Sequence, residues 1–364
     1  MDTDALVLVA PRRLERRRLR VPDVGEDDAV VRVEACGLCG TDHEQYTGTL
    51  PLPFAFVPGH ETVGTVTAIG DMAARRWGVE PGDRIAVEVF QSCRECAPCR
   101  AGEYRRCIRH GLRDMYGATS VERAPGLWGG YAGHQYLSRD TMLHRVPGNL
   151  DPVTATVFNP LGAGIRWAVT VPGTREGDVV AVLGPGIRGL CATAAAKDAG
   201  AGFVMVTGVG PRDAPRLAIA SQFGADAVCD VTSDDPVDVL RDGAGCLADV
   251  VVDVTAKAPE ALAQAVALAR PGGTVVVAGT RGVAETPGFH PDHVVYKELR
   301  LVGALGVDAP AYAQALDVLA SRRYPFDTLP RRVASLGETE TLLQAMAGET
   351  DVPPPVHGVV VPDA

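Results

Sequence analysis

The chain has 364 residues, of which 46% are hydrophobic and 22% charged, and its formal net charge is −10. This length predicts two domains that each bury a core, and the acidic balance argues against a nucleic-acid binder. No apolar run reaches the length of a membrane span. The first residues do not resemble a signal or transit peptide, so the nine cysteines indicate a reducing cytoplasm, where clustered thiols bind metal more often than they form disulfides.

The first 155 or so residues predict a twisted, largely antiparallel β domain. Six arginines between residues 12 and 20 predict a solvated edge strand or turn, with a phosphate-binding arm as the alternative. Short runs rich in β-branched residues, bounded by Pro-Gly turns, then predict strands over 30–37, 61–70 and 83–90.

Four cysteines fall within fifteen residues in the pattern C-x2-C-x2-C-x7-C. They are Cys93, Cys96, Cys99 and Cys107. Four thiolates this close in a loop-like stretch predict one closed, tetrahedral zinc site of structural type. Two disulfides, or four unrelated buried thiols, are the alternatives.

From about residue 160 short buried-type runs alternate with alanine-rich helical stretches. The runs cover 179–183, 203–207, 227–231, 249–254 and 274–278, with 299–303 as a sixth candidate. This alternation predicts an α/β domain with a doubly wound parallel sheet. A helix is expected over 310–321, and the tail after it is too short for a domain of its own.

A glycine-rich turn follows the first run of this second domain, with the sequence Gly184-Pro185-Gly186-Ile187-Arg188-Gly189. Its position between a strand and a helix is the context that a dinucleotide-binding turn requires. In such a turn the glycines permit a tight bend, a close approach of pyrophosphate and close helix packing. Gly184, Gly186, Ile187 and Gly189 are therefore candidate cofactor contacts, and a glycine-rich turn without a ligand is the alternative.

The second strand ends at Gly208, where an NAD site usually carries an acid for the ribose hydroxyls. The missing acid removes repulsion against a 2′-phosphate, and Arg212 or Arg216 can pair with one. This pattern favours NADP. If Asp213 turns back to the ribose instead, NAD remains the alternative.

Two further motifs lie in the first domain, Gly37–Asp42 (GLCGTD) and Pro58–Gly64 (PGHETVG). Together with the cysteine run and the glycine-rich turn, in this order, they resemble the medium-chain zinc-containing alcohol dehydrogenases, which include polyol and threonine dehydrogenases. The resemblance covers nearly the whole chain. It implies a GroES-like catalytic domain over 1–158, completed by 304–364, and a Rossmann dinucleotide-binding domain over 159–303.

The resemblance also implies the roles of individual residues. Cys39 and His60 match the ligands of a catalytic zinc, and Glu61 matches an acid that lies beside that metal. Thr41 matches the residue that bonds the substrate oxygen. Asp42 matches the acid that orients the histidine ligand. Glu44 or His43 is expected to relay protons, with a solvated loop as the alternative.

The chain departs from the family at the third zinc ligand, where Asn159 stands in the run Phe158-Asn159-Pro160-Leu161. Three outcomes remain open: zinc bound through Cys39, His60 and Glu61, weak binding with Asn159 or water, or no catalytic zinc.

The activity expected is hydride transfer between NAD(P) and a small alcohol or polyol, in a homo-oligomer (a dimer or a tetramer). A catalytic-zinc-free NADPH reductase of activated C=C bonds and a non-catalytic nucleotide-binding relative are the alternatives.

Overall fold

The computed structural model describes residues 1–50, 52–282 and 284–363, and the chain divides into two compact units. One unit comprises Met1–Asn159 with Asp308–Ala364, and the other comprises Pro160–Val307. The sequence predicts one domain over 1–158 with 304–364 and another over 159–303. Residue 364 lies outside the described part of the chain. Among the described residues, no helix is both long and apolar enough to cross a membrane.

The first unit is built on a largely antiparallel sheet with the strand order β14-β15-β3-β4-β5-β7, in which β6 also pairs with β3. A separate hairpin joins β1 to β2. The strands are β1 (Asp2–Ala10), β2 (Arg13–Arg20), β3 (Ala29–Leu38), β4 (Glu61–Ile69), β5 (Arg84–Val87), β6 (His134–Leu137), β7 (Leu143–Arg145), β14 (Arg331–Ala334) and β15 (His357–Val360). The helices are α1 (Gly40–Thr47), α2 (Asp71–Trp77), α3 (Ala97–Arg100), η1 (Tyr104–Arg106), α4 (Pro152–Ala155), α11 (Ala309–Ser321), η4 (Phe326–Thr328), η5 (Leu336–Glu338) and α12 (Thr339–Ala347), while α5 (Phe158–Ile165) crosses the unit boundary.

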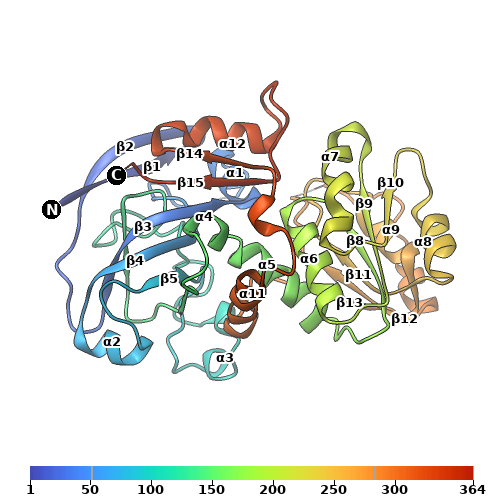
Figure 1. Ribbon diagram of the computed structural model, residues 1–364, viewed down its shortest axis with the longest axis horizontal. Coiled ribbons are helices and arrows are strands. Elements are labelled where there is room, and N and C mark those ends of the chain that lie inside the picture. Colours follow the sequence, from blue (N-terminus) through green and yellow to red (C-terminus); the bar gives the residue numbers. More distant parts are fainter. Residues whose placement is uncertain (51, 283, 364) are drawn as a thin grey trace. The chain divides into compact units, whose positions relative to one another are not determined.

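The second unit is a doubly wound α/β domain, as the sequence predicts. Its parallel sheet has the order β10-β9-β8-β11-β12-β13, with helices on both faces (Figure 1). The strands are β8 (Val179–Leu183), β9 (Phe203–Gly208), β10 (Ala227–Asp230), β11 (Ala248–Asp253), β12 (Ala269–Val277) and β13 (Arg300–Gly303). The helices are η2 (Arg166–Thr170), α6 (Ile187–Asp198), α7 (Gly210–Ala220), η3 (Ser221–Phe223), α8 (Pro236–Ala244), α9 (Ala261–Leu268) and α10 (Pro291–Tyr296). All five residues of β8 are buried, because a central parallel strand is covered on both faces.

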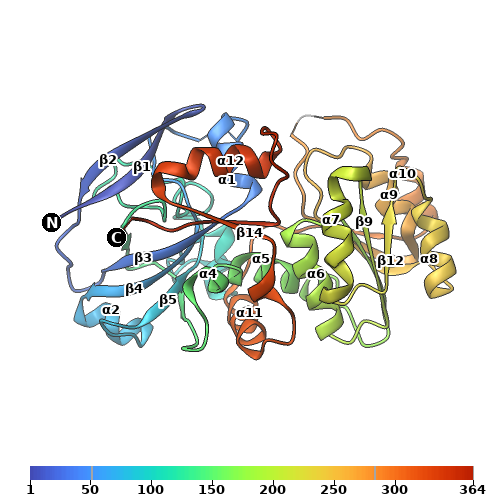
Figure 2. The same cartoon turned by 45° about the horizontal axis from the view of Figure 1, so that its top comes forward.

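The C-terminal segment completes the first unit. Strand β15 pairs antiparallel with β3, and β14 pairs with β15. Helix α12 contacts α1, the helix that follows β3, and the two lie side by side (Figure 2). The end of the chain is therefore in contact with the elements that carry the first motif, GLCGTD.

The arginine-rich segment forms strand β2, the solvated strand that the sequence predicts. Four of its arginines face acids: Arg13 and Arg17 pair with Glu15, Arg16 pairs with Asp4 and Asp363, and Arg20 pairs with Asp23. These acids offset much of the positive charge that a phosphate-binding arm would need.

Gly164 lies where α5 packs against α6, and it provides a stability test. A Cβ at this position would lie 2.6 Å from the Cys191 carbonyl carbon and 2.7 Å from the Ala192 nitrogen. Because backbone cannot move aside as a flexible side chain does, we expect Gly164→Ala to lower the free energy of unfolding by about 1–3 kcal/mol. Gly303→Ala is the control, since a Cβ there meets nothing within 4 Å. Equal urea midpoints for the two variants would contradict the close helix contact.

Candidate active site and metal centres

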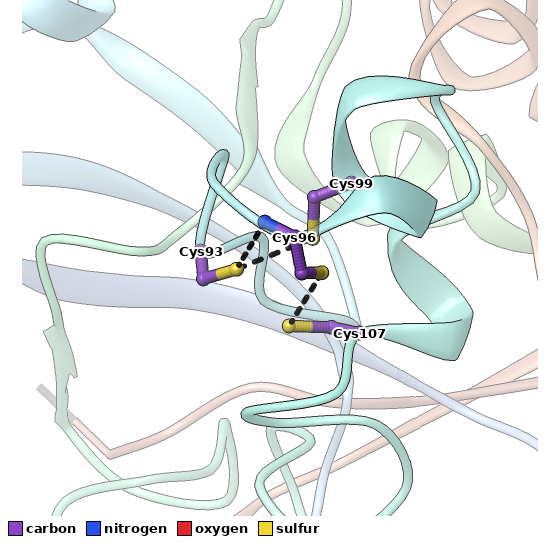
Figure 3. A group of neighbouring side chains, drawn as sticks. All are labelled: Cys93, Cys96, Cys99 and Cys107. Carbon is purple, nitrogen blue, oxygen red and sulfur yellow. Dashed lines mark hydrogen bonds between the residues drawn. The ribbon is translucent and has the colours of Figure 1, made fainter.

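The four predicted zinc ligands converge in one lobe of the first unit (Figure 3). The sulfurs of Cys93 and Cys99 are 3.7 Å apart, and those of Cys96 and Cys107 are 4.0 Å apart. A zinc tetrahedron with metal–sulfur bonds of about 2.3 Å has sulfur–sulfur edges of about 3.8 Å. All nine cysteines are free thiols. The geometry therefore fits a four-thiolate metal site and not a pair of disulfides.

The electrostatics of this lobe also favour a cation. Burial raises the pKa of Cys93, but backbone N–H groups of Cys96 and Glu95 outweigh it and lower the pKa below the usual value. Burial and the neighbouring sulfurs of Cys96 and Cys107 raise the pKa of Cys99 to about 12. The lobe thus stabilises some thiolates and holds another as a thiol. A divalent metal removes this conflict because its charge offsets all four sulfurs.

A second cluster of metal-binding side chains comprises Cys39, Asp42 and His60. Cys39 directly follows β3 and caps α1, while His60 directly precedes β4. The Cys39 sulfur lies 3.2 Å from His60 Nε2, and His60 Nδ1 lies 3.5 Å from Asp42 Oδ1. The other Asp42 oxygen accepts the backbone N–H of Cys39 at 2.9 Å. One carboxylate thus faces the outer nitrogen of the imidazole and fixes the loop that carries the thiol.

This cluster has the donor set and the charge that a metal site requires. Burial alone lowers the pKa of His60, but the negative charges of Cys39 and Asp42 outweigh it and raise the pKa well above the usual range. The pocket therefore favours a positive charge between thiolate and imidazole. With Nε2 beside the sulfur and Nδ1 toward Asp42, the ring presents Nε2 to a metal, as is common where a carboxylate lies behind a histidine ligand.

The two further ligand candidates lie in different surroundings. Glu61 begins β4 and is buried, and a Cβ at Gly37 would meet its Oε2 at 2.3 Å. Its carboxylate therefore lies over Gly37 of β3 and is not part of the Cys39–Asp42–His60 group. Asn159 lies in the first turn of α5, where it is buried, and its Nδ2 donates a hydrogen bond of 3.1 Å to the Tyr312 hydroxyl.

The candidate catalytic and relay residues share helix α1. Thr41 lies in its first turn, next to Asp42. His43 is buried and its Nε2 lies 2.8 Å from Glu349 Oε1. Arg12 and His43 lower the pKa of Glu349 to about 2, so this carboxylate is ionised at neutral pH. Glu44 is half-buried on the same helix.

A cavity of about 540 Å³ opens at the carboxyl ends of the strands in the second unit. It is lined by Gly184, Gly186, Gly189, Gly208, Arg212 and Arg216 among the predicted contacts, and by Pro185, Arg188, Thr255 and Lys257 besides. Ile187, also predicted, is not among the lining residues. Gly184 has a φ of +100°, and a Cβ at Gly189 would lie 1.8 Å from the Gly184 carbonyl oxygen, so both glycines are required by the turn.

The end of β9 is crowded at the position of the usual ribose-binding acid. A Cβ at Gly208 would lie 3.0 Å from both Asp213 Cβ and Pro185 Cγ. Asp213 itself is buried, with one oxygen accepting the Val209 N–H at 3.0 Å and the other 3.0 Å from Arg216 Nη1. Its carboxylate is therefore bound within its own loop.

Two structural pairs carry little or no signal in the sequence. Tyr312 meets Asn159 across 153 positions of the chain. Asp253, at the end of β11, forms a buried ion pair with Arg281 and accepts hydrogen bonds from Thr255 in the cavity wall. For Asp253 the sequence carries one signal of a functional position, namely its place at the end of a predicted strand. Side chains at such ends border ligand crevices in open α/β sheets.

Two family models match the chain. The alcohol dehydrogenase GroES-like domain covers residues 25–148, and the zinc-binding dehydrogenase model covers residues 189–321. A probable alcohol dehydrogenase of Mycobacterium tuberculosis is 71% identical over 359 residues, covering 98% of each chain.

More distant relatives share the same fold. The sorbitol dehydrogenase of Bacillus subtilis is 29% identical over 325 residues, covering 87% of this chain and 86% of its own. The solved structure of a putative zinc-binding dehydrogenase from Sinorhizobium meliloti, bound to NADP, is similar with a TM-score of 0.85, 28% identity and full coverage of both chains.

Cys99 tests the four-thiolate site. We expect Cys99→Ser to lose one zinc per chain, because the remaining three thiolates leave a tetrahedral site open. The melting temperature should fall by several degrees, since each kcal/mol corresponds to about 2–4 °C in a large domain. Metal analysis and calorimetry measure the two effects, and Cys246→Ser, at an exposed free thiol, is the control. Unchanged zinc in Cys99→Ser would refute the assignment.

Proposed function

The chain belongs to the medium-chain zinc-containing alcohol dehydrogenases, and we propose that its Cys39–Asp42–His60 cluster is the catalytic centre of that activity. The protein is an NAD(P)-dependent oxidoreductase that interconverts an alcohol or polyol and its carbonyl compound. The single observation that carries the assignment of the centre is the 3.2 Å approach of the Cys39 sulfur to His60 Nε2, with Asp42 behind the ring.

In this proposal Cys39 and His60 hold the zinc, which acts as a Lewis acid on the substrate oxygen when it is bound. Asp42 keeps the His60 ring in the tautomer that presents Nε2. Thr41, next to Asp42 in the first turn of α1, accepts the proton of the substrate hydroxyl and at the same time passes its own hydroxyl proton on toward the relay residue, His43 or Glu44. Asn159, a neutral oxygen donor, or water fills the third ligand position. Glu61 supports the site from its place over Gly37.

His43 is the relay candidate with the better-defined path. Its side chain is buried, but its Nε2 reaches Glu349, whose side chain is 29% exposed. A proton that arrives at His43 therefore has a hydrogen-bonded route toward solvent. Glu44, on the same helix, is the second relay candidate.

The cavity of the second unit is proposed to hold NADP. Gly208 leaves no carboxylate to repel a 2′-phosphate, and the Asp213 carboxylate is engaged by Arg216 and the Val209 N–H. Arg212, in the cavity wall, supplies a cation for that phosphate. The solved relative that is bound to NADP is consistent with this choice.

Two properties of the whole protein are also proposed. A homo-oligomer, either dimer or tetramer, is expected from the family. A cytoplasmic location is proposed because nine thiols all remain free.

Zinc content combined with activity tests the catalytic centre. We expect about two zinc ions per chain and NADP-dependent oxidation of one or more members of a panel of polyols and simple alcohols. Cys39→Ser should lower zinc to about one per chain and reduce kcat/KM at least 100-fold, because the metal loses its thiolate. Cys229→Ser, at a buried thiol of the second unit, is the control and should retain both zinc and activity. One zinc per wild-type chain, with reduction of activated C=C bonds instead, would establish the catalytic-zinc-free reductase.

Arg212 tests the cofactor choice. We expect Arg212→Ala to raise KM for NADP about 10–100-fold and to change KM for NAD less than threefold, because only NADP carries the phosphate that the guanidinium binds. Arg241→Ala removes an exposed arginine of α8 and is the control. Equal changes for both cofactors would show that Arg212 does not recognise the 2′-phosphate.

A further inference from the structure

The amide of Asn159 is held in one orientation. Its side chain is only 4% exposed, and its nitrogen donates to the Tyr312 hydroxyl at 3.1 Å. An asparagine amide has a donor end and an acceptor end. With the donor end bound to Tyr312, the oxygen is the end that can act as a ligand.

Tyr312 is itself fixed by two neighbouring rings. Its ring centroid lies 5.2 Å from that of Phe158 and 5.8 Å from that of His144. His144 Nε2 lies 2.8 Å from one oxygen of Glu88, and the other oxygen accepts the Tyr104 hydroxyl. Glu88 is fully buried, so these bonds provide the polar partners that its carboxylate needs.

This chain of contacts ends in the four-cysteine lobe. Tyr104 and Arg105 belong to η1, which lies between Cys99 and Cys107 in the sequence. Arg105, buried like Tyr104, lies 3.6 Å from Asp308, and Asp308 caps α11 by accepting the Ala311 N–H.

Ala309, the first residue of α11, packs against the apolar core of the lobe. The lobe therefore contacts the first turn of the helix that carries Tyr312 in three ways: the Tyr104–Glu88–His144 chain, the Arg105–Asp308 pair and the packing of Ala309.

We propose that the four-cysteine lobe positions Asn159 for the catalytic metal, with Tyr312 and Arg105 as positioning residues. Metal in the lobe orders η1, η1 fixes the start of α11, and Tyr312 then directs the Asn159 oxygen toward the metal held by Cys39 and His60. The inference rests on the proposed function, since it requires metal at Cys39 and His60. A neutral amide is a weaker zinc ligand than a carboxylate, so its fixed orientation contributes more to binding here than it would for a charged ligand. Because coupling between two binding sites is reciprocal, occupation of either metal site strengthens the other.

Cobalt binding provides a test that does not depend on turnover. The full-length protein is treated with a chelator until only the lobe retains zinc, and Co²⁺ is then titrated while its visible d–d absorption is recorded. We expect Tyr312→Phe to weaken cobalt binding about 10–100-fold, as substitutions behind metal ligands commonly do. The d–d band should also change in shape and intensity, because a loosened amide alters the coordination. Arg105→Gln should change binding in the same direction while the lobe retains its zinc.

Tyr136→Phe is the matched control. It removes a phenol hydroxyl that donates to a carboxylate, Asp28, at 2.8 Å, in the same unit but outside the chain of contacts. Its cobalt affinity should remain within twofold of wild type.

A double-mutant cycle decides whether Tyr312 acts through Asn159. In an Asn159→Ala background, Tyr312→Phe should have no further effect on cobalt affinity, because the amide it directs is gone. An equal effect in both backgrounds, or no effect of Tyr312→Phe in the wild-type background, would overturn the inference while leaving the proposed function intact. If Tyr312→Phe does not fold, Arg105→Gln in the two backgrounds gives the same decision. A wild-type protein that binds no Co²⁺ beyond the lobe would overturn the proposed function itself, and the inference with it.

Discussion

The pairing of β3 with β4 brings the candidate ligands together. Gly37 lies opposite Glu61 and Cys36 opposite Thr62, so Cys39 and His60 emerge from the same end of one antiparallel ladder. A slip of one residue along such a ladder turns each side chain to the opposite face. The buried contact of the Glu61 carboxylate with Gly37 resists such a slip. A slip would bring a residue with a side chain to the place of Gly37, and that side chain would displace the carboxylate. The position of the thiolate beside the imidazole, the capping of α1 by Cys39 and the place of Asp42 all depend on this register.

The sequence predicted those parts of the molecule whose signals are local. The spacing of Cys93, Cys96, Cys99 and Cys107 predicted the lobe, and the glycine-rich turn predicted one part of the wall of the cavity. The short apolar runs of the second unit predicted its strands within a few residues, because buried parallel strands are apolar throughout. Ile187 lies within the glycine-rich motif and is therefore a predicted cofactor contact. In the structure it is the first residue of α6 and does not line the cavity.

The partners that position the site were beyond reach of the sequence. His43 meets Glu349 across 306 positions, and Asn159 meets Tyr312 across 153. Neither helical nor strand periodicity carries information at such separations, because these contacts arise only when the C-terminal segment returns to the first unit. That return also supplies β15 to the central strand β3. The last fifty or so residues, which show no motif, therefore take part in the organisation of the catalytic unit.

The crowding around Gly208 also bears on how cofactor preference can change during evolution. An acid at this position would need space that Pro185 and Asp213 now fill. A change of Gly208 to Asp therefore requires Pro185 or Asp213 to shift by a few tenths of an ångström. A smaller residue at either neighbour would ease the introduction of the carboxylate, so the effects of the two substitutions are expected to depend on each other. Steric coupling of this kind makes the order in which such substitutions arise matter, even when the binding energies involved are small.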